Sequence, residues 1–328
     1  MASCSCQRWT ERLSALASKE SDQKRNMKRL LAPVLCLLFV TTAHACNIPV
    51  FRYALERWRP DVCQVVVPES IKLSAQEQKI LDRFTETAHI QVIRSAVSTT
   101  ESLNTACIVR CKIANGHQVN VWSGPVSELP KLHLDQSPAR TELSRRLLKG
   151  DSVVWLMIKS SDEKKNAAAR KKLTAHFDVL GKKIELPEGI GLPGSELFSD
   201  VPLLLQFSLL EIDPSDPEEA FLVKLLSGIQ ADAFSEGQPL LVPVFGRGRA
   251  LEVIPADDLS VNLIEDLTVF LSGACSCQVK ERNPGFDLLI ATDWDRELFG
   301  ADGEAPPDKP ALQQRGGKPV LLTIPPGK

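Results

Sequence analysis

Cys275 and Cys277, two cysteines separated by one residue, are the pair in this sequence best placed to do chemistry together. A C-x-C pair can close a small disulfide ring, whose strained geometry makes the bond easy to reduce, as a redox pair requires. We expect the pair to follow the C-terminal end of an amphipathic helix over 260–274, where the helix dipole disfavours a thiolate. Three interpretations stay open: a redox-active pair, structural disulfides to distant cysteines, or reduced and buried thiols.

The segment Gly246-Arg247-Gly248-Arg249 lies between two β-type runs. Glycine supplies the positive φ that a hairpin turn needs, so the sequence predicts a β-hairpin with Arg247 and Arg249 facing solvent. The functional alternative is an anion-binding site, in which Arg247, Arg249 and backbone N–H groups bind a carboxylate or phosphate. The nucleotide fingerprint G-x-G-x-x-G is absent, because no glycine stands three residues after Gly248. We expect no cofactor.

The cysteines beyond residue 45 are even in number, which permits disulfides in an exported protein but does not give their connectivity. They are Cys46, Cys63, Cys107, Cys111, Cys275 and Cys277. The pair Cys107 and Cys111 together with the C-x-C pair could form a four-thiolate zinc site or two disulfides. Neither spacing is the C-x2-C that is common in zinc sites, so we expect no metal. No histidine stands in a ligand motif, and no nucleophile–base pair is recognisable.

The first 45 residues are typical of an export signal. The apolar run 30–40 is about a dozen residues, shorter than the ~20 that a membrane-spanning helix needs. A small-x-small cleavage site ends at Ala45, and Met27 would give a signal of normal length. We therefore predict that 1–45 is an over-extended start plus a signal peptide, and that the protein is exported to the periplasm or cell envelope. Membrane association through an uncleaved signal or a lipidated Cys46 is the alternative. Basic residues precede the apolar run: Lys24, Arg25, Lys28 and Arg29.

Composition is that of a soluble globular protein, with 43% apolar and 24% charged residues. The net charge is −2, and removal of residues 1–45, with seven basic and three acidic side chains, leaves about −6. Such a surface lacks the basic footprint of a nucleic-acid-binding protein, so we expect no nucleic-acid partner.

Strand-like and helix-like segments alternate along the middle of the chain, which favours an α/β fold with a mixed sheet and flanking helices. Residues 98–117, with Cys107 and Cys111, are expected to be irregular or partly helical. The Gly- and Pro-rich stretch 187–200 is expected to be an exposed linker. The domain prediction is a first α/β unit at 46–186, the linker 187–200, a second unit at 201–299 with the hairpin and the C-x-C pair, and a flexible Pro/Gly-rich tail at 300–328. Expected strands are 62–68, 89–97, 119–126, 152–160, 201–213, 240–245 and 249–255; expected helices are 50–58, 74–88, 138–148, 162–183, 218–229 and 260–274.

Three segments carry a resemblance to known sequences: ACNIPVFRYALERW at 45–58, VPVFGRGRAL at 242–251 and GACSCQVKERNPGFDLLIATDWD at 273–295. Together they resemble an uncharacterised family of exported proteins from planctomycete-type bacteria. The resemblance implies export and implies that Cys46 and the Cys275/Cys277 pair belong to the family pattern, but it brings no activity. Glu252 stands where the family has an apolar or aromatic residue, which implies a more exposed second hairpin strand.

The order of elements is also loosely similar to that of the thioredoxin-like fold, so we expect two thioredoxin-like units. Neither unit has a C-x-x-C at a helix N-terminus, and fold similarity alone does not give a function. The preferred hypothesis is a non-enzymatic binding or assembly role with structural cysteines, in which the hairpin and 283–295 contact an unknown envelope protein or small molecule. The alternative is a thiol–disulfide redox protein that uses Cys275 and Cys277.

Overall fold

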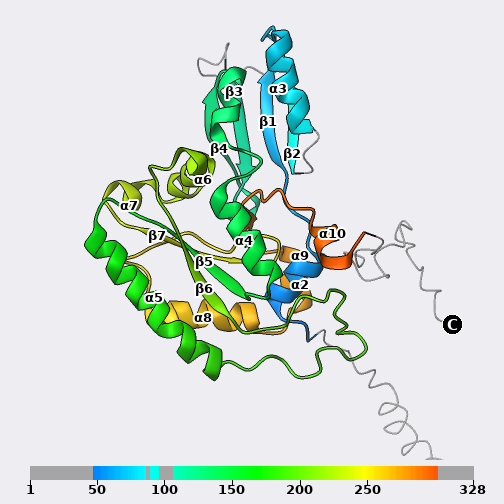
Figure 1. The fold of residues 1–328 in the computed structure, drawn as a ribbon, viewed down its shortest axis with the longest axis vertical. Helices are drawn as coiled ribbons and strands as arrows, with labels where there is room; N and C mark the ends of the chain where they lie inside the picture. The colour runs from blue at the N-terminus through cyan, green and yellow to red at the C-terminus, as the bar shows by residue number, and fades with distance from the viewer. Residues whose placement is uncertain (1–46, 86–88, 96–105, 302–328) are drawn as a thin grey trace, which may run out of the picture. The chain divides into compact units, whose positions relative to one another are not determined.

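The computed structural model describes residues 47–85, 89–95 and 106–301, which form an α/β fold with two mixed sheets flanked by helices (Figure 1). The expected fold class is confirmed. The chain divides into Met1–Ala45 and one compact unit, Cys46–Lys328. The predictions for the signal peptide, for Cys46 and for the tail beyond residue 301 concern residues outside this description. None of the helices in the described ranges has the length and apolar composition of a membrane-spanning segment.

The first sheet has four strands in the order β2-β1-β3-β4. β1 runs parallel to β2, and β3 lies antiparallel to both β1 and β4. The elements are β1 (Cys63–Pro68), α3 (Ala75–Thr85), β2 (Ile90–Ser95), β3 (Cys107–Lys112) and β4 (Gln118–Gly124).

Strand β3 corrects the expectation that residues 98–117 are irregular or partly helical. Of its six residues, CIVRCK, four are buried and two are half-buried. β3 lies between β1 and β4, so its backbone hydrogen bonds go to strands on both sides. A strand supported by two neighbours does not need the long β-branched run that would reveal it in sequence.

Helix starts and stops follow the local signals in the sequence. At α3, Glu77 N–H donates to Ser74 Oγ (3.2 Å) and Ser74 N–H donates to Glu77 Oε2 (2.8 Å), which is a capping box formed by the S-x-x-E pattern at 74–77. α4 (Pro138–Leu148) starts after its N-cap Ser137, as expected. Gly150 follows it with φ 105°, a conformation that favours glycine.

The second sheet has six strands, with the order β10-β8-β7-β5-β6 and with β9 also paired to β7. β5 is parallel to β6 and antiparallel to β7. Its six residues are all buried, because β5 has a neighbouring strand on each side and helices on both faces. The strands are β5 (Val153–Ile158), β6 (Phe207–Ile212), β7 (Leu240–Phe245), β8 (Arg249–Ala250), β9 (Ile254–Pro255) and β10 (Phe286–Asp287).

Helices cover both faces of the six-stranded sheet (Figure 1). Side chains of β5 alternate between the two faces, as the strand period requires. One face, with Leu156, packs in a core that includes α4 and α6 and continues into the four-stranded sheet. The other face, with Trp155, packs against α2, α5 and α8. The remaining helices and 3-10 turns are α2 (Val50–Arg57), η1 (Ala114–Gly116), η2 (Val126–Leu132), α5 (Glu163–Lys183), η3 (Pro217–Glu219), α6 (Ala220–Ile229), α7 (Ala231–Ser235), α8 (Val261–Ser272), α9 (Cys277–Arg282) and α10 (Trp294–Phe299).

The strand pairing differs from the expected division at 187–200. β5 precedes that segment, yet it pairs with β6 and β7, which follow it. The six-stranded sheet therefore contains strands from both sides of the expected linker. Two expected strands also differ in extent: 201–213 forms a strand only at β6, and 249–255 is divided into β8 and β9 with an exposed Glu252 between them.

Both sheets follow the same order of elements along the chain. In each, a strand, a helix and a parallel strand are followed by two antiparallel strands and then a helix. In the four-stranded sheet these elements are β1, α3, β2, β3, β4 and α4. In the six-stranded sheet they are β5, α5, β6, β7, β8 and α8, with α6 and α7 between β6 and β7. In each, the first strand lies between the second and third strands. The described chain thus contains the same topology twice, although the sequence shows no period.

Candidate functional site

The glycines of the hairpin allow close packing on both sides of its turn. Gly246 and Gly248 have φ angles of 59° and 88°, as the sequence predicts for a turn. A Cβ on Gly246 would lie 2.6 Å from Ala54 Cβ in α2, and one on Gly248 would overlap Ile290. The hairpin is therefore wedged between α2 and the segment after β10.

Arg247 joins the hairpin turn to the end of α2. Its Nε donates to Leu55 O (2.8 Å) and its Nη2 donates to Glu56 O (3.2 Å). The same guanidinium forms a 2.8 Å ion pair with Asp295. Because carbonyl groups in the last turn of a helix lack intrahelical partners, Arg247 supplies donors that stabilise the C-terminal end of α2.

Arg249 is only 2% exposed, so the expectation that both arginines face solvent was wrong. Its Nε donates to Pro284 O (2.8 Å), and its Nη2 donates to Asn283 O (2.9 Å) and Gly285 O (3.0 Å). These carbonyls precede β10, which pairs with β8 and covers it. The donors of both predicted anion-binding residues, Arg247 and Arg249, are thus directed at groups of the chain itself.

Two carboxylates complete the surroundings of Arg249. Its Nη1 lies 3.1 Å from Asp287 Oδ2 and 3.2 Å from Asp61 Oδ2. Asp61 N–H donates to Asp287 Oδ2, and Lys112 Nζ forms a 2.8 Å ion pair with Asp61. Since Lys112 belongs to β3 and Asp287 to β10, this cluster connects the two sheets.

The charge balance of this cluster depends on Asp287. Burial raises the pKa of the Asp287 carboxyl to about 6, Arg249 opposes the shift, and the Asp61 carboxylate adds to it. Below that pH the Asp287 carboxyl holds its proton, and above it the buried Asp287 carboxylate lies beside the half-buried Asp61 carboxylate, with one arginine and one lysine as their partners. Sequence reasoning missed Asp61 and Asp287, because neither stands in a motif and they are far apart in the chain.

The C-x-C pair spans two different environments. Cys275 is 1% exposed, and its N–H donates to Ile48 O (2.9 Å) beside the bridge between Pro49 and Ala274. Cys277 is exposed and is the first residue of α9, whose N-cap Ser276 accepts from Val279 N–H (3.3 Å). The expected placement after a helix end was therefore incomplete: α8 ends at Ser272, and a new helix begins at the second cysteine.

The buried charged side chains of α2 hold the backbone of the connection between α5 and β6, which includes the expected linker 187–200. Arg52 Nη1 donates to Val201 O (2.7 Å) and Nη2 to Ser199 O (2.6 Å). Glu56 Oε1 accepts from Ser199 N–H (3.1 Å) and from Arg52 Nε (2.9 Å). Arg57 Nη2 donates to Glu196 O (2.7 Å). The i,i+4 spacing of Arg52 and Glu56 was the signal in the sequence that could have indicated this network.

Three apolar side chains of this connection face solvent: Leu192 is 61% exposed, Phe198 49% and Leu204 41%. The Arg57 guanidinium lies 4.6 Å from the centre of the Phe198 ring, which is a cation–π contact. Neighbouring positions are anchored, since Ser195 and Ser199 are buried and Asn47 N–H donates to Ser195 Oγ (2.9 Å). The segment thus combines a fixed backbone with an exposed apolar surface.

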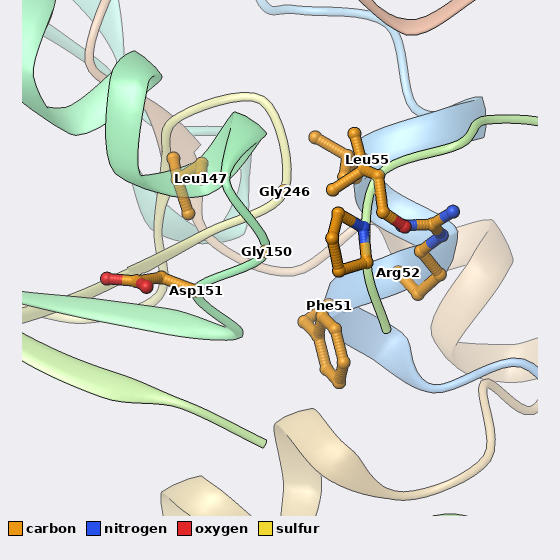
Figure 2. A pocket seen from close by; sticks show the side chains of 9 residues that line it. Phe51, Arg52, Leu55, Leu147, Gly150, Asp151 and Gly246 are labelled. Carbon is orange, nitrogen blue, oxygen red and sulfur yellow. The ribbon is translucent and has the colours of Figure 1, made fainter. Parts of the chain in front are cut away.

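A small cavity lies between α2 and the C-terminal end of α4, and Val201 and Pro202 of this connection also line it. Figure 2 shows Phe51, Arg52 and Leu55 on one side of it and Leu147 and Asp151 on the other. Its volume is about 10 Å³, which is room for about one water molecule. This cavity can therefore hold a solvent molecule but not an organic substrate.

Across the described ranges, no group of three or more His, Cys, Asp or Glu side chains is arranged to hold a metal ion. Cys107 and Cys111 pack in the core of the four-stranded sheet, whereas Cys275 packs on the α2, α5 and α8 face of the other sheet. The structure therefore does not bring together the two cysteine pairs that the sequence analysis considered as zinc ligands. In comparisons with known proteins, no family model and no curated protein matches the chain.

Proposed function

We propose that this chain is an exported, non-enzymatic binding or assembly protein of the cell envelope, and that residues 187–206 form its contact surface for a partner protein. The observation that carries the proposal is the connection between α5 and β6. It has no helix or strand from residue 184 to residue 206, and hydrogen bonds from α2 fix its backbone. Connections longer than about 12–15 residues without secondary structure are uncommon in compact domains and are usually functional.

The buried network of α2 supports a binding role for this surface. Arg52 and Glu56 are both 1% exposed, and their hydrogen bonds go to the backbone of residues 198–201. A surface whose backbone is already ordered loses less conformational entropy on binding, so its exposed apolar groups contribute more to affinity. Three large apolar side chains of this ordered connection are exposed, and exposed apolar surface is the kind that protein contacts bury.

The repeated topology supports two thioredoxin-like units as the scaffold. The order of elements and the strand directions of both sheets agree with that fold. A thioredoxin-like oxidoreductase carries its cysteines in the turn before the first helix. Here the turn between β5 and α5 contains Ser160, Ser161 and Asp162, and Asp162 Oδ1 accepts from Lys164 N–H (2.9 Å) as a helix cap. A capping role at this position favours a structural use of the fold.

A photo-crosslinking amino acid placed at positions 192, 198 and 204 tests the contact surface in cells that make the protein. We expect a discrete crosslinked species of the same mass from all three positions. Matched control positions are Val179, Val261 and Val269, which are exposed apolar residues of α5 and α8. Equal crosslinking from control positions, or none from the three test positions, would contradict the proposal.

Two further measurements separate the remaining parts of the proposal. Amino-terminal sequencing of protein from the envelope fraction is expected to begin at Cys46, whereas a product that retains the apolar run would show an anchor.

Thiol trapping addresses the redox alternative. A measurable dithiol–disulfide equilibrium between Cys275 and Cys277 in glutathione buffers would favour that alternative over the binding role.

A further inference from the structure

Cys63 and Cys111 lie directly opposite each other in neighbouring antiparallel strands. The register of β1 and β3 pairs Gln64 with Arg110, so the next residues outward are Cys63 and Cys111. Cys63 N–H donates to His89 O (2.9 Å), on the β2 side of the strand. Because N–H and C=O of one strand residue point the same way, Cys63 occupies a non-hydrogen-bonded position toward β3, where paired Cα atoms are about 4.5 Å apart.

The two thiols are in contact inside the core. The Sγ atoms are 2.7 Å apart, and the residues are only 1% and 3% exposed. The Cα separation of a non-hydrogen-bonded pair falls within the roughly 4.4–6.8 Å range of disulfides, and the two side chains point to the same face of the sheet. We propose that Cys63 and Cys111 form a cross-strand disulfide that joins β1 to β3.

The bond forms by thiol–disulfide exchange with an external disulfide donor. The thiolate of one cysteine attacks the donor disulfide and releases one donor thiol, which leaves a mixed disulfide. The second cysteine attacks the mixed disulfide and releases the other donor thiol. Cys63 and Cys111 together lose two protons and two electrons, and the donor disulfide is reduced to two thiols. Exchange occurs before the strands close, because neither sulfur is accessible in the folded core.

The surroundings favour a structural bond over a catalytic pair. A hydrogen bond to Cys111, together with burial, raises the pKa of the Cys63 thiol well above its usual range. Catalytic thiols have the opposite character, since they are partly exposed and have a lowered pKa. The bond, once formed, is therefore shielded from exchange.

Cys107 does not compete for this bond. Continuation of the register of β1 and β3 places Cys107 opposite Val67, and its thiol donates to Gly124 O (3.3 Å). Burial raises the pKa of the Cys107 thiol to about 11. Cys107 is thus a matched control, because it is a buried thiol of the same strand with no cysteine opposite it.

Refolding of the full chain tests the proposal. The chain is unfolded and reduced, then refolded with oxidised and reduced glutathione, alkylated and digested with trypsin. Cleavage after Arg57, Lys72, Arg110 and Lys112 separates Cys111 from Cys107. We expect peptide 58–72 linked to peptide 111–112 as the dominant product, at least tenfold above any species linked through Cys107. The Cys107→Ala variant is expected to keep this product, and Cys63→Ala and Cys111→Ala to lose it.

Recovery of Cys63 and Cys111 in alkylated form, from protein that unfolds cooperatively, would overturn the proposal. So would a dominant bond from either cysteine to another partner. Direct alkylation of the protein in the cells that make it gives a second readout that needs no refolding. Refolding in vitro does not depend on the proposed export. If Cys63 and Cys111 are linked after refolding in vitro but not in cells, the proposed export would be wrong and the ability of the pair to form a disulfide would stand.

Discussion

Arg249 in the hairpin and Asp61 ahead of β1 form an ion pair of 3.2 Å that connects the two sheets of the protein. The guanidinium also donates to three carbonyls of the turn 283–285, so one buried side chain organises three segments that are distant in sequence. Removal of one member of such a cluster leaves the other buried charges without a partner, and the consequences can be measured.

Arg249→Gln should lower the free energy of unfolding by about 3–5 kcal/mol, the usual cost of breaking a buried ion pair from one side. Urea unfolding followed by circular dichroism would measure the loss. Arg282→Gln is the matched control, because Arg282 is exposed on α9, and we expect a change within about 0.5 kcal/mol. Similar values for the two variants would show that the cluster does not stabilise the fold.

Asp287 should make the protein less stable as pH rises. Its folded pKa of about 6 lies above the value of 3.8 for a free carboxyl, so its stabilising contribution is complete below about pH 4 and is lost as pH rises through 6. The shift of about two units corresponds to roughly 3 kcal/mol. Asp287→Asn, which cannot ionise, removes this dependence. Urea unfolding of both proteins at pH 4 and pH 7 should therefore show the wild type losing stability relative to the variant.

Asp213→Asn provides the opposite sign for comparison. Hydrogen bonds from Lys159 and Ser215 lower the pKa of the Asp213 carboxyl. A lowered folded pKa gives stability that is present above the unfolded value and lost as pH falls. The wild type should therefore lose stability relative to this variant as pH falls below about 4, and the difference between the two proteins should stay nearly constant between pH 4 and pH 7. The same slope for both variants would contradict the assignment of the pH effect to Asp287.

Gly285→Ala should be far more harmful than Gly191→Ala. The two glycines have similar φ angles, 88° and 84°, so the strain of a left-handed alanine, about 1 kcal/mol, is common to both. A Cβ on Gly285 would overlap the Ala250 carbonyl oxygen, whereas nothing lies within 4 Å of one on Gly191. We expect a further loss of about 2–4 kcal/mol at Gly285, measured by urea unfolding. An equal loss at the two positions would mean that β8 and β10 are not closely packed.

Arg52→Gln should release the connection 187–206 from α2. Its charged hydrogen bonds to Ser199 O and Val201 O are worth about 1.5–3 kcal/mol each, so local opening should increase at least tenfold. Thermolysin, which cleaves before apolar residues, would report this opening as faster cutting at Leu192, Phe198 or Leu204. Arg83→Gln is the control, because Arg83 forms an exposed ion pair with Asp135. Cleavage of both variants at the wild-type rate would show that Arg52 does not hold the segment.

Elements with strong local signals could be predicted from sequence. The capping box at Ser74, the start of α4 after Ser137 and the central strand β5 each follow from residues adjacent in the chain. β3 could not be predicted, because its stability comes from β1 and β4 on either side of it. The short α9 was missed for a related reason, as its six residues have a capping serine but no apolar period.

The candidate site was harder to predict than the fold, because its interactions are between distant residues. The two glycines of the hairpin were enough to predict its turn. They could not predict the burial of Arg249, because that depends on carbonyls more than thirty residues further along the chain. The i,i+4 spacing of Arg52 and Glu56 suggests that they pair with each other, but it does not give their backbone partners, which lie more than 140 residues further along the chain. Cys63 and Cys111 could be counted, but their pairing required the register of β1 and β3.

The N-terminal segment of the described unit is held by residues near its other end. Ile48 and Val50 exchange backbone hydrogen bonds with Cys275 and Gly273, and α2 packs beside the hairpin. A chain that emerges from a ribosome or a translocation channel with its N-terminus first must therefore leave residues 48–50 without these backbone partners until residues 273–275 have followed. Contacts of such large sequence separation slow folding, because the entropy of closing the loop is lost before the contacts form. Folding of this unit is thus completed only after residues 273–275 have been synthesised or transferred, and a factor that shields residues 48–58 during that interval would raise its yield.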